Sequence, residues 1–132
     1  MKVALIGDIH ANLPALETVL KDAHKREVDA VWNVGDIVGY GAFPEEVVQR
    51  LKNDNVMTII GNYDLKVLKV ESRKQQNKKH SRKWFAFNWA YENLSESSRE
   101  YLSSLPKEIK MEEAGKRILI THGSPESNEE YI

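Results

Sequence analysis

The sequence predicts an α/β fold built on a βαβαβ parallel sheet. Three short apolar runs rich in Val and Ile lie at residues 3–6, 30–34 and 56–60, and each is followed directly by Gly-Asp or Gly-Asn. Runs of this length and composition are typical of buried parallel strands. The segments between them carry apolar residues at helical spacing. Right-handed crossovers through such helices would bring the three strand ends to one edge of the sheet.

The two intervening helices have recognisable starts. Asn12 is positioned to cap the first helix, and Pro44, followed by two acids, opens the second. In the second helix Val47, Val48 and Leu51 share the face that is expected to point inward.

The second half of the chain is expected to contain two more helices and a hairpin. The aromatic stretch at 84–91 predicts a helix whose aromatic side chains belong to the core rather than to a base-stacking platform. A short helix should begin near Ser95 and end at Pro106. The apolar segments 109–111 and 118–121 flank a turn and predict a β-hairpin.

Length and composition exclude several classes of protein. The 132 residues fit a single domain over residues 1–132, and a net charge of -1 excludes a globally basic nucleic-acid binder. The absence of cysteine excludes disulfide scaffolds and thiolate metal sites. No apolar run approaches the roughly 20 residues that a membrane-spanning helix needs. We therefore expect a cytoplasmic protein without a membrane partner.

The charge is nevertheless uneven along the chain. From Lys66 to Lys83 there are eight basic residues and one acid, Glu71. Such a segment is usually a solvated helix face or loop. The alternative is that it borders a functional site and binds nucleic acid, because lysine contacts to phosphates give salt-sensitive affinity that does not depend on sequence.

Polar side chains that bind metals follow the predicted strands. Because the carboxyl ends of parallel strands meet at one edge of a sheet, these side chains could converge there. Carboxylate, amide and imidazole groups without thiols suit manganese, iron, zinc or magnesium. The candidates are Asp8, His10, Asp36, Asn62, Asp64 and His122.

Four motifs in this order resemble those of the calcineurin-like metallophosphoesterases, in particular the small stand-alone phosphodiesterases of bacteria and archaea. They are GDIHAN at 7–12, GDIVGYG at 35–41, GNYD at 61–64 and THGSP at 121–125. The resemblance spans nearly the whole chain. It implies the N-terminal half of that family's α/β sandwich and metal-dependent hydrolysis of phosphodiesters or phosphomonoesters.

The resemblance also implies a role for each candidate. Asp8 and His10 would bind one metal ion, and Asn62 and His122 would bind a second. Asp36 would bridge the two ions. Asn62, Tyr63 and Asp64 would form the catalytic group, with Asp64 orienting its neighbours. The implied cofactors are two divalent ions, manganese first and iron, zinc or nickel as alternatives, and the implied substrate is a small phosphoester or nucleotide-like compound.

The chain departs from the family pattern at Tyr63, where the family most often has a histidine beside the leaving group. A tyrosine has an ordinary pKa near 10 and a histidine near 6.5, so Tyr63 would be the poorer proton donor at neutral pH. We expect slow turnover of esters with poor leaving groups.

A second departure lies after His122, where the Gly-His-x-His loop of the family is missing. By that template five of seven protein ligands are present, so we expect a C-terminally incomplete domain with weak or absent activity. Two alternatives stay open. One is a catalytically degenerate domain that binds metal or phosphate and acts through a partner, and the other is a nucleic-acid-binding module that uses Lys66 to Lys83.

Overall fold

The predicted parallel sheet is present in the computed structural model, which describes residues 1–74 and 81–130. It consists of β1 (Val3–Ile6), β2 (Ala30–Asn33) and β3 (Met57–Thr58), in the order β1-β2-β3. Both neighbouring pairs are parallel, as predicted.

The third strand is shorter than the predicted 56–60. The backbone N–H of Ile59 still donates to the carbonyl oxygen of Asn33 at 3.1 Å, beyond the last residue of β3. The next amide, of Ile60, instead donates to the carbonyl oxygen of Pro106 at 2.9 Å. The backbone therefore leaves the sheet toward the segment that precedes the hairpin.

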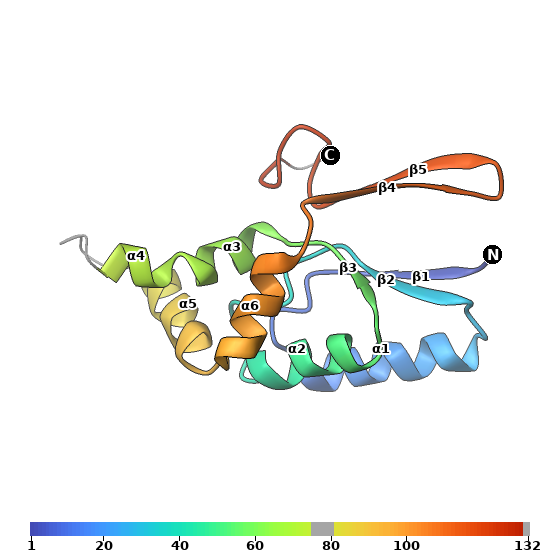
Figure 1. Cartoon of the computed structure of the whole chain (residues 1–132). Helices are drawn as coiled ribbons and strands as arrows, with labels where there is room; N and C mark the ends of the chain where they lie inside the picture. The colour runs from blue at the N-terminus through green and yellow to red at the C-terminus, as the bar shows by residue number, and fades with distance from the viewer. Residues whose placement is uncertain (75–80, 131–132) are drawn as a thin grey trace.

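The two crossover helices pack on one face of the sheet (Figure 1). α1 (Leu13–Lys25) is capped by Asn12, whose Oδ1 accepts from the backbone N–H of Ala15 at 3.1 Å, as predicted. α2 (Pro44–Asn53) buries its predicted inward side chains completely. These side chains are Val47, Val48 and Leu51.

Four helices gather beyond the carboxyl ends of the strands (Figure 1). They are α3 (Asn62–Leu68), α4 (Val70–Lys74), α5 (Arg82–Glu92) and α6 (Glu96–Ser104). Their shared core joins that of α2, and it includes Val67, Val70, Phe87, Ala90 and Leu102. Part of the basic segment, including Lys78 and Lys79, lies outside the described residues.

The predicted aromatic helix is α5, but the prediction that its aromatic side chains lie in the core is wrong for two of them. Phe87 and Ala90 are buried, whereas Phe85 is 59% and Trp89 43% exposed. Positions 85 and 89 are four apart in the sequence and therefore share one helix face, which points away from the packed face of α5.

The predicted hairpin lies on the other face of the sheet from α1 and α2 (Figure 1). β4 (Glu108–Glu113) pairs antiparallel with β5 (Lys116–Thr121), and the turn between them contains Ala114 and Gly115. β5 ends directly before His122 and so delivers this residue toward the parallel sheet. Within residues 1–74 and 81–130, no helix has the length and apolar character needed to cross a bilayer.

Candidate metal centre

The loops that follow β1 and β2 stay hydrogen-bonded to each other beyond the strands. The amide of Asp8 donates to the carbonyl oxygen of Gly35 at 3.0 Å, and that of His10 to Asp36 at 2.9 Å. Asp8, His10 and Asp36 all have positive φ, between 47° and 56°. Non-glycine residues adopt this left-handed conformation rarely, and it concentrates at functional sites. The unusual backbone turns three candidate side chains toward one place.

Asp8, His10 and Asp36 form a compact group of potential ligands. His10 Nε2 lies 3.6 Å from Asp8 Oδ1 and 3.6 Å from Asp36 Oδ2. One ligand atom from each of the three residues lies within 4.8 Å of the other two. The Asp36 side chain is only 3% exposed, whereas that of Asp8 is 69% exposed. Burial raises the pKa of Asp36, although the hydrogen bond from Tyr63 N–H and the nearby imidazoles oppose this effect.

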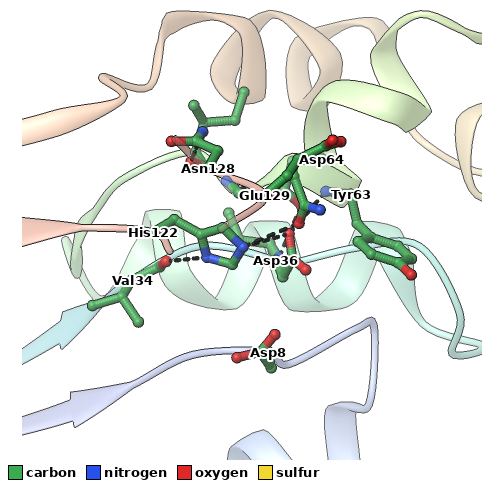
Figure 2. A network of polar contacts seen from close by, with 12 residues as sticks. Asp8, Val34, Asp36, Tyr63, Asp64, His122, Asn128 and Glu129 are labelled. Atoms are coloured by element: carbon green, nitrogen blue, oxygen red, sulfur yellow. Dashed lines mark hydrogen bonds and ion pairs between the residues drawn. The ribbon is translucent and has the colours of Figure 1, made fainter. Parts of the chain in front are cut away.

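Two further candidates meet Asp36 from the opposite side. His122 Nε2 lies 3.5 Å from Asp36 Oδ1 and 3.1 Å from Asn62 Oδ1. Asn62 is the first residue of α3, and His122 follows β5. Figure 2 shows the His122 ring between Val34 and the Asp36 carboxylate. Asp36 therefore lies between the two imidazoles.

Backbone carbonyl groups fix the orientation of both histidine rings. His122 Nδ1 lies 2.7 Å from the carbonyl oxygen of Val34, and His10 Nδ1 lies 3.3 Å from that of Val38. Because a carbonyl oxygen only accepts hydrogen bonds, Nδ1 carries the proton in each ring. The lone pair of each Nε2 then faces carboxylate and amide oxygens.

This arrangement fits divalent metal ions. Lone pairs on nitrogen and oxygen that face one another repel unless a cation or a proton lies between them. Imidazole Nε2 with Nδ1–H held by a carbonyl is the usual arrangement of a metal-binding histidine. The donors are oxygen and nitrogen, which suits manganese, iron or zinc.

Asp64 lies behind the site and connects the loops that form it. Its fully buried carboxylate accepts from the backbone N–H groups of Ile37 at 2.8 Å, Val38 at 2.9 Å and Gly61 at 2.9 Å. Burial raises the pKa of Asp64 to about 6, although these three hydrogen bonds act in the opposite direction. Asp64 thus holds the loop that carries Asp36 against the start of α3.

Two tyrosines and a lysine lie at the mouth of the site. The Tyr40 hydroxyl donates to the Tyr63 hydroxyl at 2.8 Å, and Lys83 Nζ donates to the same oxygen at 3.3 Å. The bond from Tyr40 lowers the pKa of Tyr63, and the same bond raises the pKa of Tyr40. The hydrogen bond to Tyr63 raises the pKa of Lys83. The rings of Tyr40 and Tyr63 each lie 5.1 Å from the His10 ring.

All of the predicted site residues except Asp64 line one pocket of about 450 Å³. Sequence reasoning missed several of the other residues of this site. Tyr40 stands inside the GDIVGYG motif and could have been found there, whereas the segment 128–130 carries no local signal. Lys83 stands out in the sequence only as one basic residue among eight, because its contact with Tyr63 depends on the packing of α5 against α3.

Comparisons with known proteins agree with the fold and with the motifs. Residues 1–131 match the family model described as calcineurin-like phosphoesterase. An uncharacterized protein of Methanocaldococcus jannaschii is 36% identical over 132 residues, which cover 98% of this chain and 53% of that protein. A symmetrical bis(5'-nucleosyl)-tetraphosphatase of Sodalis glossinidius is 34% identical over 85 residues, covering 62% of this chain and 30% of that enzyme.

A solved structure also matches the whole chain and belongs to the metallophosphoesterases. The metallophosphoesterase from Sphaerobacter thermophilus superimposes with a TM-score of 0.75 at 35% identity, over 100% of this chain and 51% of its own. The chain thus spans about half the length of the Methanocaldococcus and Sphaerobacter relatives. With the family match over nearly every residue and the four motifs around one pocket, the chain belongs to the calcineurin-like phosphoesterase family.

Proposed function

We propose that this chain supplies the metal site of a phosphoesterase that hydrolyses phosphodiesters or phosphomonoesters. One observation carries the proposal: the buried Asp36 carboxylate lies 3.6 Å from His10 Nε2 and 3.5 Å from His122 Nε2. A carboxylate between two imidazoles from different strands is suited to bridge two divalent ions.

The same proposal assigns the remaining ligands. Asp8 and His10 would hold the first ion, and Asn62 and His122 the second. Manganese is the expected metal, with iron, zinc or nickel as alternatives, because oxygen and nitrogen donors accept all of them. When bound, such ions neutralise charge on phosphoryl oxygens and acidify water.

The first turn of α3 would supply the chain's own catalytic groups. The Asn62 amide would stabilise charge on a phosphoryl oxygen. The Tyr63 hydroxyl would hydrogen-bond to the leaving group. Asp64 is a positioning residue, since its carboxylate is bonded to backbone N–H groups and lies outside the pocket.

We further propose that residues 1–132 form a single domain that is incomplete at its C-terminal side. The half-length match to relatives supports this, and so does the lack of a Gly-His-x-His loop. The name of the Sodalis relative points to dinucleotide substrates as well as small phosphoesters. A cytoplasmic location stays a prediction from the absence of cysteine.

Hydrolysis of bis(p-nitrophenyl) phosphate with added manganese tests the proposal. We expect weak turnover that a chelator abolishes and that Asp36→Asn lowers about a hundredfold, with Asp22→Asn on α1 as the matched control. Equal activity of the wild type and Asp36→Asn would overturn it. Calorimetric manganese binding without turnover would favour the catalytically degenerate domain instead.

Nucleic-acid binding is a second candidate, favoured by the exposed face of α5. Arg82, Phe85 and Trp89 share that face at helical spacing. Aromatic side chains beside a basic one can stack bases. Binding to single-stranded DNA should then weaken steeply with added salt and with Trp89→Ala. A flat salt response would exclude this function.

A further inference from the structure

Both ends of the basic segment reach the same tyrosine. Lys66 Nζ lies 5.1 Å from the centroid of the Tyr63 ring, and Lys83 Nζ lies 5.9 Å from it. Lys83 Nζ also donates to the Tyr63 hydroxyl at 3.3 Å. The helices α3 and α5 thereby bring two ammonium groups next to Tyr63, which lines the pocket that contains Asp36.

The two lysines differ in the charge that surrounds them. Lys66 forms an ion pair with Glu129 at 2.9 Å, so its charge is largely compensated. The ion pairs found within residues 1–74 and 81–130 do not include Lys83. Of the two lysines beside Tyr63, Lys83 is therefore the one that has no ion pair with a described residue.

The Tyr63 hydroxyl is arranged as a donor. Its oxygen accepts from Tyr40 and from Lys83, and a phenol has two acceptor positions and one O–H. With both acceptor positions filled, the remaining function of this hydroxyl is to donate. Two donors to one oxygen also polarise its O–H bond, which strengthens the hydrogen bond that it gives.

We propose that Tyr63 and Lys83 form an anion subsite that binds a second phosphate group, the one that leaves. The substrate class would then be phosphoanhydrides, in which the leaving group is a phosphate or a nucleotide. This inference rests on the proposed hydrolysis at the same site.

The chemistry of the leaving group agrees with a tyrosine at this position. Water adds to the attacked phosphorus, the bond from phosphorus to the bridging oxygen breaks, and that oxygen leaves with the electron pair as part of a phosphate anion. The protons of the water pass to solvent. Because the second pKa of a phosphate ester is about 6, this group leaves at neutral pH without a strong proton donor. A hydrogen bond from Tyr63 and the charge of Lys83 would suffice.

Binding of pyrophosphate and of phosphate, measured by calorimetry with and without manganese, tests the subsite. We expect the wild type to bind pyrophosphate about tenfold more tightly than phosphate. Lys83→Met should remove most of this preference and Tyr63→Phe should reduce it, whereas Lys25→Met on α1 should leave it unchanged. If pyrophosphate binds no more tightly than phosphate, or if Lys83→Met weakens both ligands equally, the subsite is overturned.

Together, the binding and hydrolysis measurements distinguish a failure of the Tyr63–Lys83 subsite from a failure of the proposed hydrolytic function. If no phosphoester is hydrolysed but the preference for pyrophosphate depends on Lys83, the subsite stands and the hydrolytic function is wrong. If bis(p-nitrophenyl) phosphate is hydrolysed and Lys83→Met does not alter the preference, the hydrolytic function stands and the subsite is wrong.

Discussion

His122 Nδ1 lies 2.7 Å from the carbonyl oxygen of Val34, although the two residues are 88 positions apart. This contact joins the end of the hairpin to the end of β2. It also fixes the imidazole so that Nε2 faces Asp36. One side chain therefore serves both to attach the second sheet and to complete the candidate metal site.

Replacement of His122 should affect metal binding and the hairpin together. We expect His122→Ala to lower manganese affinity at least tenfold, because one imidazole ligand is lost. Amide hydrogen exchange should also become faster in β4 and β5, since their anchor to Val34 is gone. His24→Ala, on the exposed side of α1, is the control. Unchanged affinity and unchanged exchange would contradict the role assigned to His122.

Gly61 is required for steric reasons. A Cβ at this position would overlap the backbone nitrogen and the Oδ1 of Asp36. We expect Gly61→Ala to displace Asp36 and to weaken manganese binding at least tenfold, measured by calorimetry. Gly115→Ala is the matched control, because a Cβ there meets open space and only the positive φ of 71° is unfavourable. Gly115→Ala should cost about 1 kcal/mol of stability and leave metal binding intact.

Local sequence patterns predicted the parallel strands, the cap by Asn12 and the convergence of Asp8, Asp36 and Asn62, because strand ends of a parallel sheet share one edge. Features that depend on distant packing were not predicted. β3 ends early because Ile60 pairs with Pro106. Likewise, an apolar period along α5 cannot reveal that Phe85 and Trp89 stay exposed while Phe87 is buried.

The rate at which this site hydrolyses a phosphodiester should depend on the leaving group. Tyr63 is a weaker acid than the histidine of the family, so activated aryl phosphodiesters should be cleaved faster than alkyl ones. Tyr63→His should narrow this difference by raising the rate on the alkyl ester. Steady-state kinetics on matched aryl and alkyl esters measure the ratio, with Tyr91→His as control. Equal rates on both esters in the wild type would exclude this role of Tyr63.

The buried carboxylate of Asp64 should give the metal-free protein a characteristic pH dependence. Its pKa in the folded state is about 6, above the ordinary value of 3.8. Between these values the folded chain holds a proton that the unfolded chain has lost. The contribution of Asp64 to stability is therefore fully present below the lower pKa and is lost as the pH rises through the upper one.

Asp64→Asn removes this titration and should alter the slope of stability against pH. Asn retains one acceptor oxygen but places an NH2 group against a backbone N–H, so it should destabilise the protein by about 1–3 kcal/mol at low pH. As the pH rises from about 4 to about 7, the deficit should shrink, because only the wild type loses stability through this carboxyl. Urea unfolding in the presence of a chelator measures the difference at each pH, with Asp22→Asn as the control. A deficit that stays constant or grows with pH would show that burial does not dominate the ionisation of Asp64.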